Sequence, residues 1–79
     1  MQTLTAQVID TNHHPRGAMP IKVEFDREAP IRVEHDGQTY RYTGKSGSNS
    51  KTGLPVREMA TEDDARLWIS LDGQRVWED

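Results

Sequence analysis

An Asp-Gly pair flanked by alternating apolar and polar residues is the feature that most restricts how this chain folds. In IRVEHDGQTYRYT, residues 31–43, the pair is Asp36-Gly37. Asp-Gly favours a two-residue turn because both central positions need positive φ, and an alternation of period two buries one face of each strand. The segment therefore predicts a β-hairpin in which Val33 faces Tyr40 and both tyrosines lie on the apolar face.

The same Asp-Gly-Gln sequence recurs in RLWISLDGQRVWED, residues 66–79, and predicts a second hairpin. In the register that this turn sets, Trp68 pairs with Trp77 across the two strands. Because successive side chains of a strand point to opposite faces, the pair lies away from the apolar face, in company with Arg66 and Arg75. We expect the two tryptophans to be partly exposed and in contact with each other.

A helix is the alternative for the first part of this segment. TEDDARLWISLDG begins with Thr61, which is suited to an N-cap, continues with acidic residues in the first turn, and ends at Gly73. This alternative gives an α+β fold with one helix over residues 61–71, in which Trp68 belongs to the core. We favour the strand, because Trp, Ile and the Asp-Gly turn are typical of hairpins.

Three further segments alternate in the same way, namely TLTAQVI, PIKVEF and LPVREMA. The chain is therefore mainly β, with about five to seven short strands separated by turn residues. This organisation indicates a small, strongly bent antiparallel sheet or a barrel of the SH3-like or OB-like kind. A chain of 79 residues has the length of one domain, and we expect residues 1–79 to form a single globular unit.

The absence of cysteine excludes disulfides, thiolate metal ligands and a cysteine nucleophile. The first residues, MQTLTAQVID, have neither a basic start nor a long apolar run, so we expect no signal peptide. No stretch approaches the roughly 20 apolar residues of a membrane span. We therefore expect a cytoplasmic protein that does not bind membranes.

The histidines do not predict a metal site by their spacing. His13 and His14 fall in the turn-rich TNHHPRGAMP, and nothing in the sequence brings His35 to them. A transition-metal site needs three or four convergent ligands. The chain also lacks the sequence pattern of a catalytic serine nucleophile. We therefore predict no metal, no cofactor and no enzymatic activity.

The segment TGKSGSNSKTG, residues 43–53, has the composition of a phosphate-binding loop without its spacing. A Walker loop needs a glycine five positions before its Gly-Lys-Ser, and that position is Thr39 here. We therefore interpret residues 43–53 as a flexible loop between two strands.

Charge is distributed unevenly around this loop. The net charge is −3, yet residues 41–57 contain four basic side chains and no acidic one, whereas residues 58–79 contain seven acidic and two basic side chains. The basic residues, which are candidates for contacts to phosphate or nucleic acid, are Arg41, Lys45, Lys51 and Arg57.

Two functions are compatible with these patterns. The first is a small protein-binding module or inhibitor that docks through Trp68, Trp77, Arg66 and Arg75, because interface hot spots are enriched in tryptophan and arginine. By size and charge it is similar to phage-encoded inhibitors of host complexes, and the same face also suits a homodimer. The alternative is a nucleic-acid-binding barrel that uses the basic segment 41–57.

Overall fold

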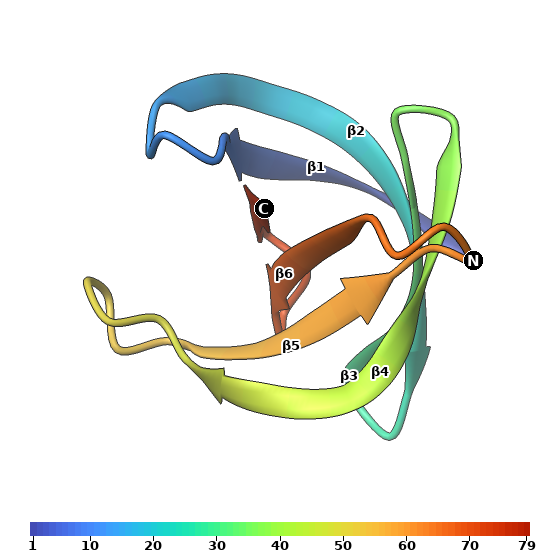
Figure 1. Ribbon diagram of the computed structural model, residues 1–79. Coiled ribbons are helices and arrows are strands. Elements are labelled where there is room, and N and C mark those ends of the chain that lie inside the picture. The colour runs from blue at the N-terminus through green and yellow to red at the C-terminus, as the bar shows by residue number, and fades with distance from the viewer.

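Seven β-strands, joined in sequence order, form a closed barrel (Figure 1). The computed structural model describes residues 1–79 and confirms the predicted small, mainly β barrel. None of its elements is a helix of the length and apolarity needed to cross a bilayer. The strands are β1 (Gln2–Ile9), β2 (Pro15–Asp26), β3 (Ala29–His35), β4 (Gln38–Ser48), β5 (Pro55–Ala60), β6 (Arg66–Ser70) and β7 (Arg75–Glu78).

A parallel pairing of the first and last strands closes the barrel. All other neighbouring strands are antiparallel, as hairpins require. β1 and β7 run in the same direction, with Gln7 beside Arg75 and Ile9 beside Trp77. The backbone N–H of Gln7 also donates to the carbonyl of Gln74 at 2.8 Å. A barrel was one of the predicted forms, but the parallel pairing of β1 with β7 was not predicted, because local patterns reveal hairpin partners and not the pairing of distant strands.

The β3–β4 hairpin has the predicted register. Val33 pairs with Tyr40. Asp36 and Gly37 both have positive φ, at 51° and 75°. Few residues other than glycine adopt such values, and Asp is one of those that tolerate them. The turn sequence therefore determines which side chains of the two strands face the core.

Residues 66–70 form a strand, and the alternative of a helix over residues 61–71 is wrong. Leu67 and Ile69 of β6 are fully buried, whereas Trp68 between them is only half-buried. An alternation of period two is the pattern of a strand that is buried on one face. The core takes the side chains of Leu67 and Ile69, which a strand directs to the same face and a helix would direct to different sides.

The residues that suggested a helix start form a tight turn between β5 and β6 instead. The backbone N–H of Asp64 donates to the carbonyl of Thr61 at 3.0 Å, and that of Ala65 donates to the Thr61 hydroxyl at 3.1 Å. A threonine or serine side chain satisfies backbone donors in turns as readily as at helix ends. The local signal was therefore ambiguous.

The β6–β7 hairpin has the predicted pairing but a longer turn. Trp68 pairs with Trp77 as expected. The turn spans residues 71–74, however, and only its glycine, Gly73, has positive φ, at 76°. The Asp-Gly pair therefore fixes the register here through a four-residue connection.

Residues 43–53 are not a continuous loop. β4 runs through residues 43–48, and after an irregularity between Tyr42 and Ser46 it pairs again with β5. Asn49 orders the remaining turn, because its side-chain oxygen accepts hydrogen bonds from the backbone N–H groups of Lys51 and Thr52 at 2.9 and 3.0 Å. The Gly- and Ser-rich composition suggested a loop, whereas backbone pairing, which needs no apolar side chain, extends the hairpin.

The core is formed by side chains that alternate along the strands and point into the barrel. Four partly buried side chains pack against this core, namely Leu4, Met19, Phe25 and Tyr42. The buried core consists of Ala6, Val8, Ile21, Val23, Val33, Tyr40, Met59, Leu67, Ile69 and Val76. Tyr40 is thus a core residue and Tyr42 packs against the core, as the alternation of β4 predicted.

Gly73 brings the backbone of the β6–β7 turn against the side chains of Leu4 and Phe25. A Cβ atom added at this position would lie 2.8 Å from Leu4 Cδ1 and 3.1 Å from Phe25 Cζ. The residue therefore needs glycine for two reasons, its positive φ and the close approach of two apolar side chains.

We predict that Gly73→Ala lowers the free energy of unfolding by about 2 to 3 kcal/mol, which combines backbone strain with overpacking. Gly37→Ala is the matched control, because Gly37 has nearly the same φ but nothing within 4 Å of the added atom. We expect it to cost only about 1 kcal/mol, the strain alone. Urea denaturation of both variants measures the difference, and equal losses would contradict the role of Leu4 and Phe25.

Candidate functional site

Trp77, Trp68 and Glu58 lie side by side across three neighbouring strands. Trp77 of β7 pairs with Trp68 of β6, which in turn pairs with Glu58 of β5. The intervening residues of β6 and β7 point into the core, so this row belongs to the outer surface of the barrel. Its two tryptophans are half-buried, as the sequence predicted.

The tryptophans line a cleft with a volume of about 360 Å³. Figure 1 shows that the β1–β2 and β4–β5 hairpins project from the barrel on the same side, with the end of β7 between them. The turns of both hairpins contribute to the walls. We call this the tryptophan cleft, and its lining residues are Thr11, His13, Gly47, Ser48, Asn49, Ser50, Val56, Trp68, Trp77, Glu78 and Asp79.

The β1–β2 turn that forms one wall is shaped by Asp10. Its carboxylate accepts hydrogen bonds from the backbone N–H groups of Asn12 and His14 at 2.9 and 2.8 Å. The bond from His14 is the main reason that the pKa of Asp10 is lowered. His13 has a positive φ of 64° within this turn and lines the cleft. The wall therefore has a defined backbone conformation.

The turn between β6 and β7 fixes the two tryptophans relative to each other. The hydroxyl of Ser70 donates to Asp72 Oδ1 at 2.6 Å and accepts from the backbone N–H of Arg75 at 3.0 Å. The bond from Ser70 is the largest cause of the lowered pKa of Asp72, followed by one from the backbone N–H of Gln74. This network stabilises the register in which Trp68 pairs with Trp77.

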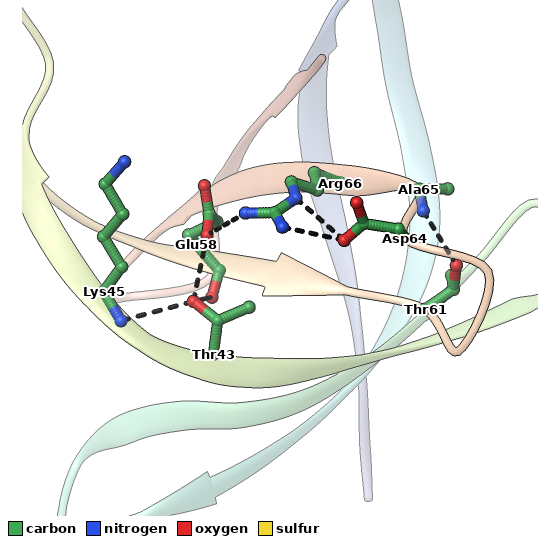
Figure 2. A network of polar contacts seen from close by, with 7 residues as sticks. All are labelled: Thr43, Lys45, Glu58, Thr61, Asp64, Ala65 and Arg66. Carbon is green, nitrogen blue, oxygen red and sulfur yellow. Dashed lines mark hydrogen bonds and ion pairs between the residues drawn. The ribbon is translucent and has the colours of Figure 1, made fainter.

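Glu58 is the buried end of the row and carries a network of polar contacts (Figure 2). Only 4% of Glu58 is exposed. Its carboxylate Oε1 accepts from the hydroxyl of Thr43 at 3.0 Å and from Arg66 Nη1 at 2.8 Å. Arg66 also contacts Asp64, at 2.7 and 3.1 Å, and this contact is the main reason that its pKa is raised. Arg66 thus neutralises a buried acid.

Lys45 adds a cation to the tryptophan row. Its Nζ lies over the ring of Trp68, 5.7 Å from the centroid, a distance at which a cation is attracted to an indole face. Its backbone N–H donates to the hydroxyl of Thr43 at 3.2 Å (Figure 2). Lys45 therefore covers part of Trp68. No corresponding cation of the chain lies over Trp77.

The two predicted partner-binding arginines differ in their surroundings. Arg66 lies next to the row but is held by Glu58 and Asp64. Arg75 is exposed and makes no ion pair, yet it does not line the cleft. The structure therefore brings the tryptophans together in one cleft and leaves both arginines outside it.

The four basic residues of segment 41–57 do not share one surface environment. Arg57 donates to the carbonyl of Pro30 at 3.1 Å and lies over the ring of Tyr42, so it takes part in internal packing. Arg41 lines a groove that also contains Glu62 and Asp63. Lys45 lies over Trp68, and Lys51 is exposed in the β4–β5 turn.

A second polar cluster lies where β3 and β7 end. His35 Nε2 is 2.8 Å from Glu78 Oε2 and 3.5 Å from Asp36 Oδ2. Arg16 of β2 contacts the same two carboxylate oxygens, and its bond to Glu78 is the main cause of its raised pKa. Burial, followed by the charges of Glu78 and Asp36, raises the pKa of neighbouring Tyr40. Sequence analysis missed this cluster, because its members come from three distant segments.

Comparisons with protein-family models, with curated proteins and with solved structures gave no match for this chain.

We predict that Arg66→Met lowers the free energy of unfolding by about 2 kcal/mol or more, because it leaves the carboxylate of Glu58 buried without its cation. Asp64→Asn is the control. The side chain of Asp64 is 74% exposed, and exposed ion pairs contribute less than about 1 kcal/mol. Chemical denaturation measures both variants. The double variant Arg66→Met with Glu58→Met should regain much of the lost free energy of unfolding, because it removes the buried charge as well. If the double variant is as destabilised as Arg66→Met alone, the role of Arg66 as the cation that pairs with Glu58 is contradicted.

Proposed function

We propose that this protein is a small, non-enzymatic protein-binding module that docks a partner through the tryptophan cleft. The observation that carries the proposal is the cross-strand pair Trp68 and Trp77, both half-buried and both lining one cleft on the outer surface. Large aromatic side chains that stay accessible at the bottom of a concave surface are the usual anchors of protein interfaces.

The chemistry of the cleft favours a protruding segment of a partner protein. Its lining includes the two indoles and Val56, which suit an apolar or planar side chain. Its walls offer backbone and small polar groups of residues 47–50, which suit hydrogen bonds to a main chain. An arginine of the partner would also fit the ring of Trp77, as Lys45 fits that of Trp68.

Charge adds a preference for a basic partner. Residues 58–79 contain seven acidic and two basic side chains, and the cleft is lined by Asp79, which makes no ion pair, and by Glu78, which Arg16 already contacts. Complementary charge accelerates association and disfavours acidic partners. In its narrower form, the proposal is that the partner is a host enzyme or complex that the protein inhibits, as phage-encoded proteins of similar size and charge do. This narrower form rests on size and charge alone.

The nucleic-acid alternative has less support. A groove that follows a phosphate backbone needs several free cations in a row. Of the four basic residues in segment 41–57, Arg57 is used in packing and Arg41 shares its groove with acidic side chains. Lys45 and Lys51 are then the cations left for a phosphate contact.

We predict that Trp77→Ala reduces capture of the partner from a cytoplasmic host extract by at least about tenfold, as the loss of a hot-spot residue does. The cross-strand aromatic contact contributes only about 0.5 to 1.5 kcal/mol beyond area burial, so the variant should stay folded. Lys22→Ala, an exposed change on β2 away from the cleft, is the matched control and should capture normally. Quantitative mass spectrometry of the three baits measures the ratio.

Two outcomes would contradict this proposal. One is a partner captured equally well by Trp77→Ala. The other is self-association of the wild type in sedimentation experiments that Trp77→Ala abolishes, which would assign the cleft to a homodimer. Trp68→Ala removes the other tryptophan of the same pair, so it provides a second measurement of both partner capture and self-association.

We predict that the double substitution Lys45→Ala and Lys51→Ala leaves partner binding within about threefold, with the change confined to the association rate, as for charges at an interface rim. Shift assays with DNA and RNA at low and high salt should show no specific complex. Binding of wild type to nucleic acid with a salt dependence that the double variant flattens, by about one unit of slope for each lost contact, would favour the alternative instead.

A further inference from the structure

Three potential metal ligands meet at the edge of the barrel where β3 and β7 end. They are the imidazole of His35, the last residue of β3, the carboxylate of Asp36 in the following turn, and the carboxylate of Glu78, the last residue of β7. One ligand atom from each lies within 4.8 Å of the other two. The ends of two strands that are distant in sequence thus supply one nitrogen and two oxygen ligands to a single point.

The two distances from His35 Nε2 to the carboxylate oxygens are close to those between ligands of a tetrahedral zinc ion. Ligands about 2.1 Å from such an ion lie about 3.4 Å from one another. The 3.5 Å between His35 Nε2 and Asp36 Oδ2 already has this value, and the 2.8 Å between His35 Nε2 and Glu78 Oε2 is about 0.6 Å shorter. A small rotation of the Glu78 side chain, which is 21% exposed, is enough to open this contact.

The histidine is held in position before any ion arrives. Its side chain is only 2% exposed, and its Nε2 atom is directed at the two carboxylates. Asp36 follows it in a tight turn with a fixed backbone conformation. A rigid nitrogen ligand beside two more accessible oxygen ligands is an arrangement that lowers the cost of assembling a site.

Arg16 supplies the positive charge that this cluster otherwise lacks. Its Nη1 atom contacts both Asp36 Oδ2, at 3.1 Å, and Glu78 Oε2. These are two of the three potential ligand atoms. The Arg16 side chain is 38% exposed on β2 and has a path into solvent. A divalent cation and the guanidinium group therefore compete for the same two oxygens.

We propose that His35, Asp36 and Glu78 form a binding site for zinc or a chemically similar divalent transition-metal ion, in which Arg16 takes the cation's position in the metal-free protein. One imidazole and two carboxylates suit zinc, and three protein ligands leave a fourth position for water. Bound metal ties the end of β7 to the β3–β4 turn. The site stands independently of the protein-binding proposal, because it needs no partner.

The test is titration of untagged protein with Zn²⁺ by calorimetry and with Co²⁺ by visible absorption, at a pH of about 7.5. Arg16→Gln removes the competing charge, and we expect it to bind about tenfold more tightly than the wild type. His35→Gln and Glu78→Gln each remove a ligand, and we expect at least a tenfold loss. The double variant His13→Gln and His14→Gln controls for binding by exposed histidines and should behave as the wild type.

A measurement that alters no ligand guards against variants that fail to fold. In the NMR spectrum of ¹⁵N-labelled Arg16→Gln, zinc should shift the Nε2 resonance of His35 and leave those of His13 and His14 unchanged. The proposal is overturned if Arg16→Gln binds no zinc at about 1 mM, the limit of weak specific association. It is also overturned if binding is lost in the His13 and His14 variant, or if the His35 resonance does not move.

Discussion

The parallel contact between β1 and β7 is the constraint on which the rest of this structure depends. It joins Gln7 and Ile9 to Arg75 and Trp77 and converts a meander of hairpins into a closed barrel. Closure gives β7 a neighbour on both sides, although it is only four residues long. Both the tryptophan cleft and the cluster around Glu78 include residues of β7, so both depend on this one strand being held in place.

The hairpins were predictable from sequence because the information that determines them is local. Alternation and the Asp-Gly turn were sufficient to pair Val33 with Tyr40 and Trp68 with Trp77. At Thr61 the local sequence did not distinguish a turn from a helix, because one side chain can satisfy backbone donors in either. The interpretation of residues 43–53 as a loop was wrong for residues 43–48, where a glycine- and serine-rich composition concealed the continuation of β4 and its pairing with β5.

The candidate sites were only partly predictable, since they are made by segments that are far apart in sequence. The tryptophan pair was found from one hairpin, but the walls around it come from two other turns. Arg66 was expected to be available to a partner, whereas it neutralises Glu58, whose burial no sequence pattern revealed. His35 and Glu78 are 43 residues apart, and their contact follows from the closure of the barrel rather than from any motif.

The closing contact also has a consequence for the order of folding. Each antiparallel hairpin joins strands that are adjacent in the chain, but β1 and β7 lie at its two ends. Bringing such distant segments together costs the most chain entropy, so the hairpins are expected to form early and the β1–β7 contact late. Trp77 and Glu78 pair with β6 in the early hairpin, but Trp77 gains its β1 neighbour Ile9, and Glu78 its contacts with His35 and Arg16, only in that last step. Any ligand that recognises them therefore selects the fully folded chain over its partly folded forms, and its binding stabilises the closed barrel.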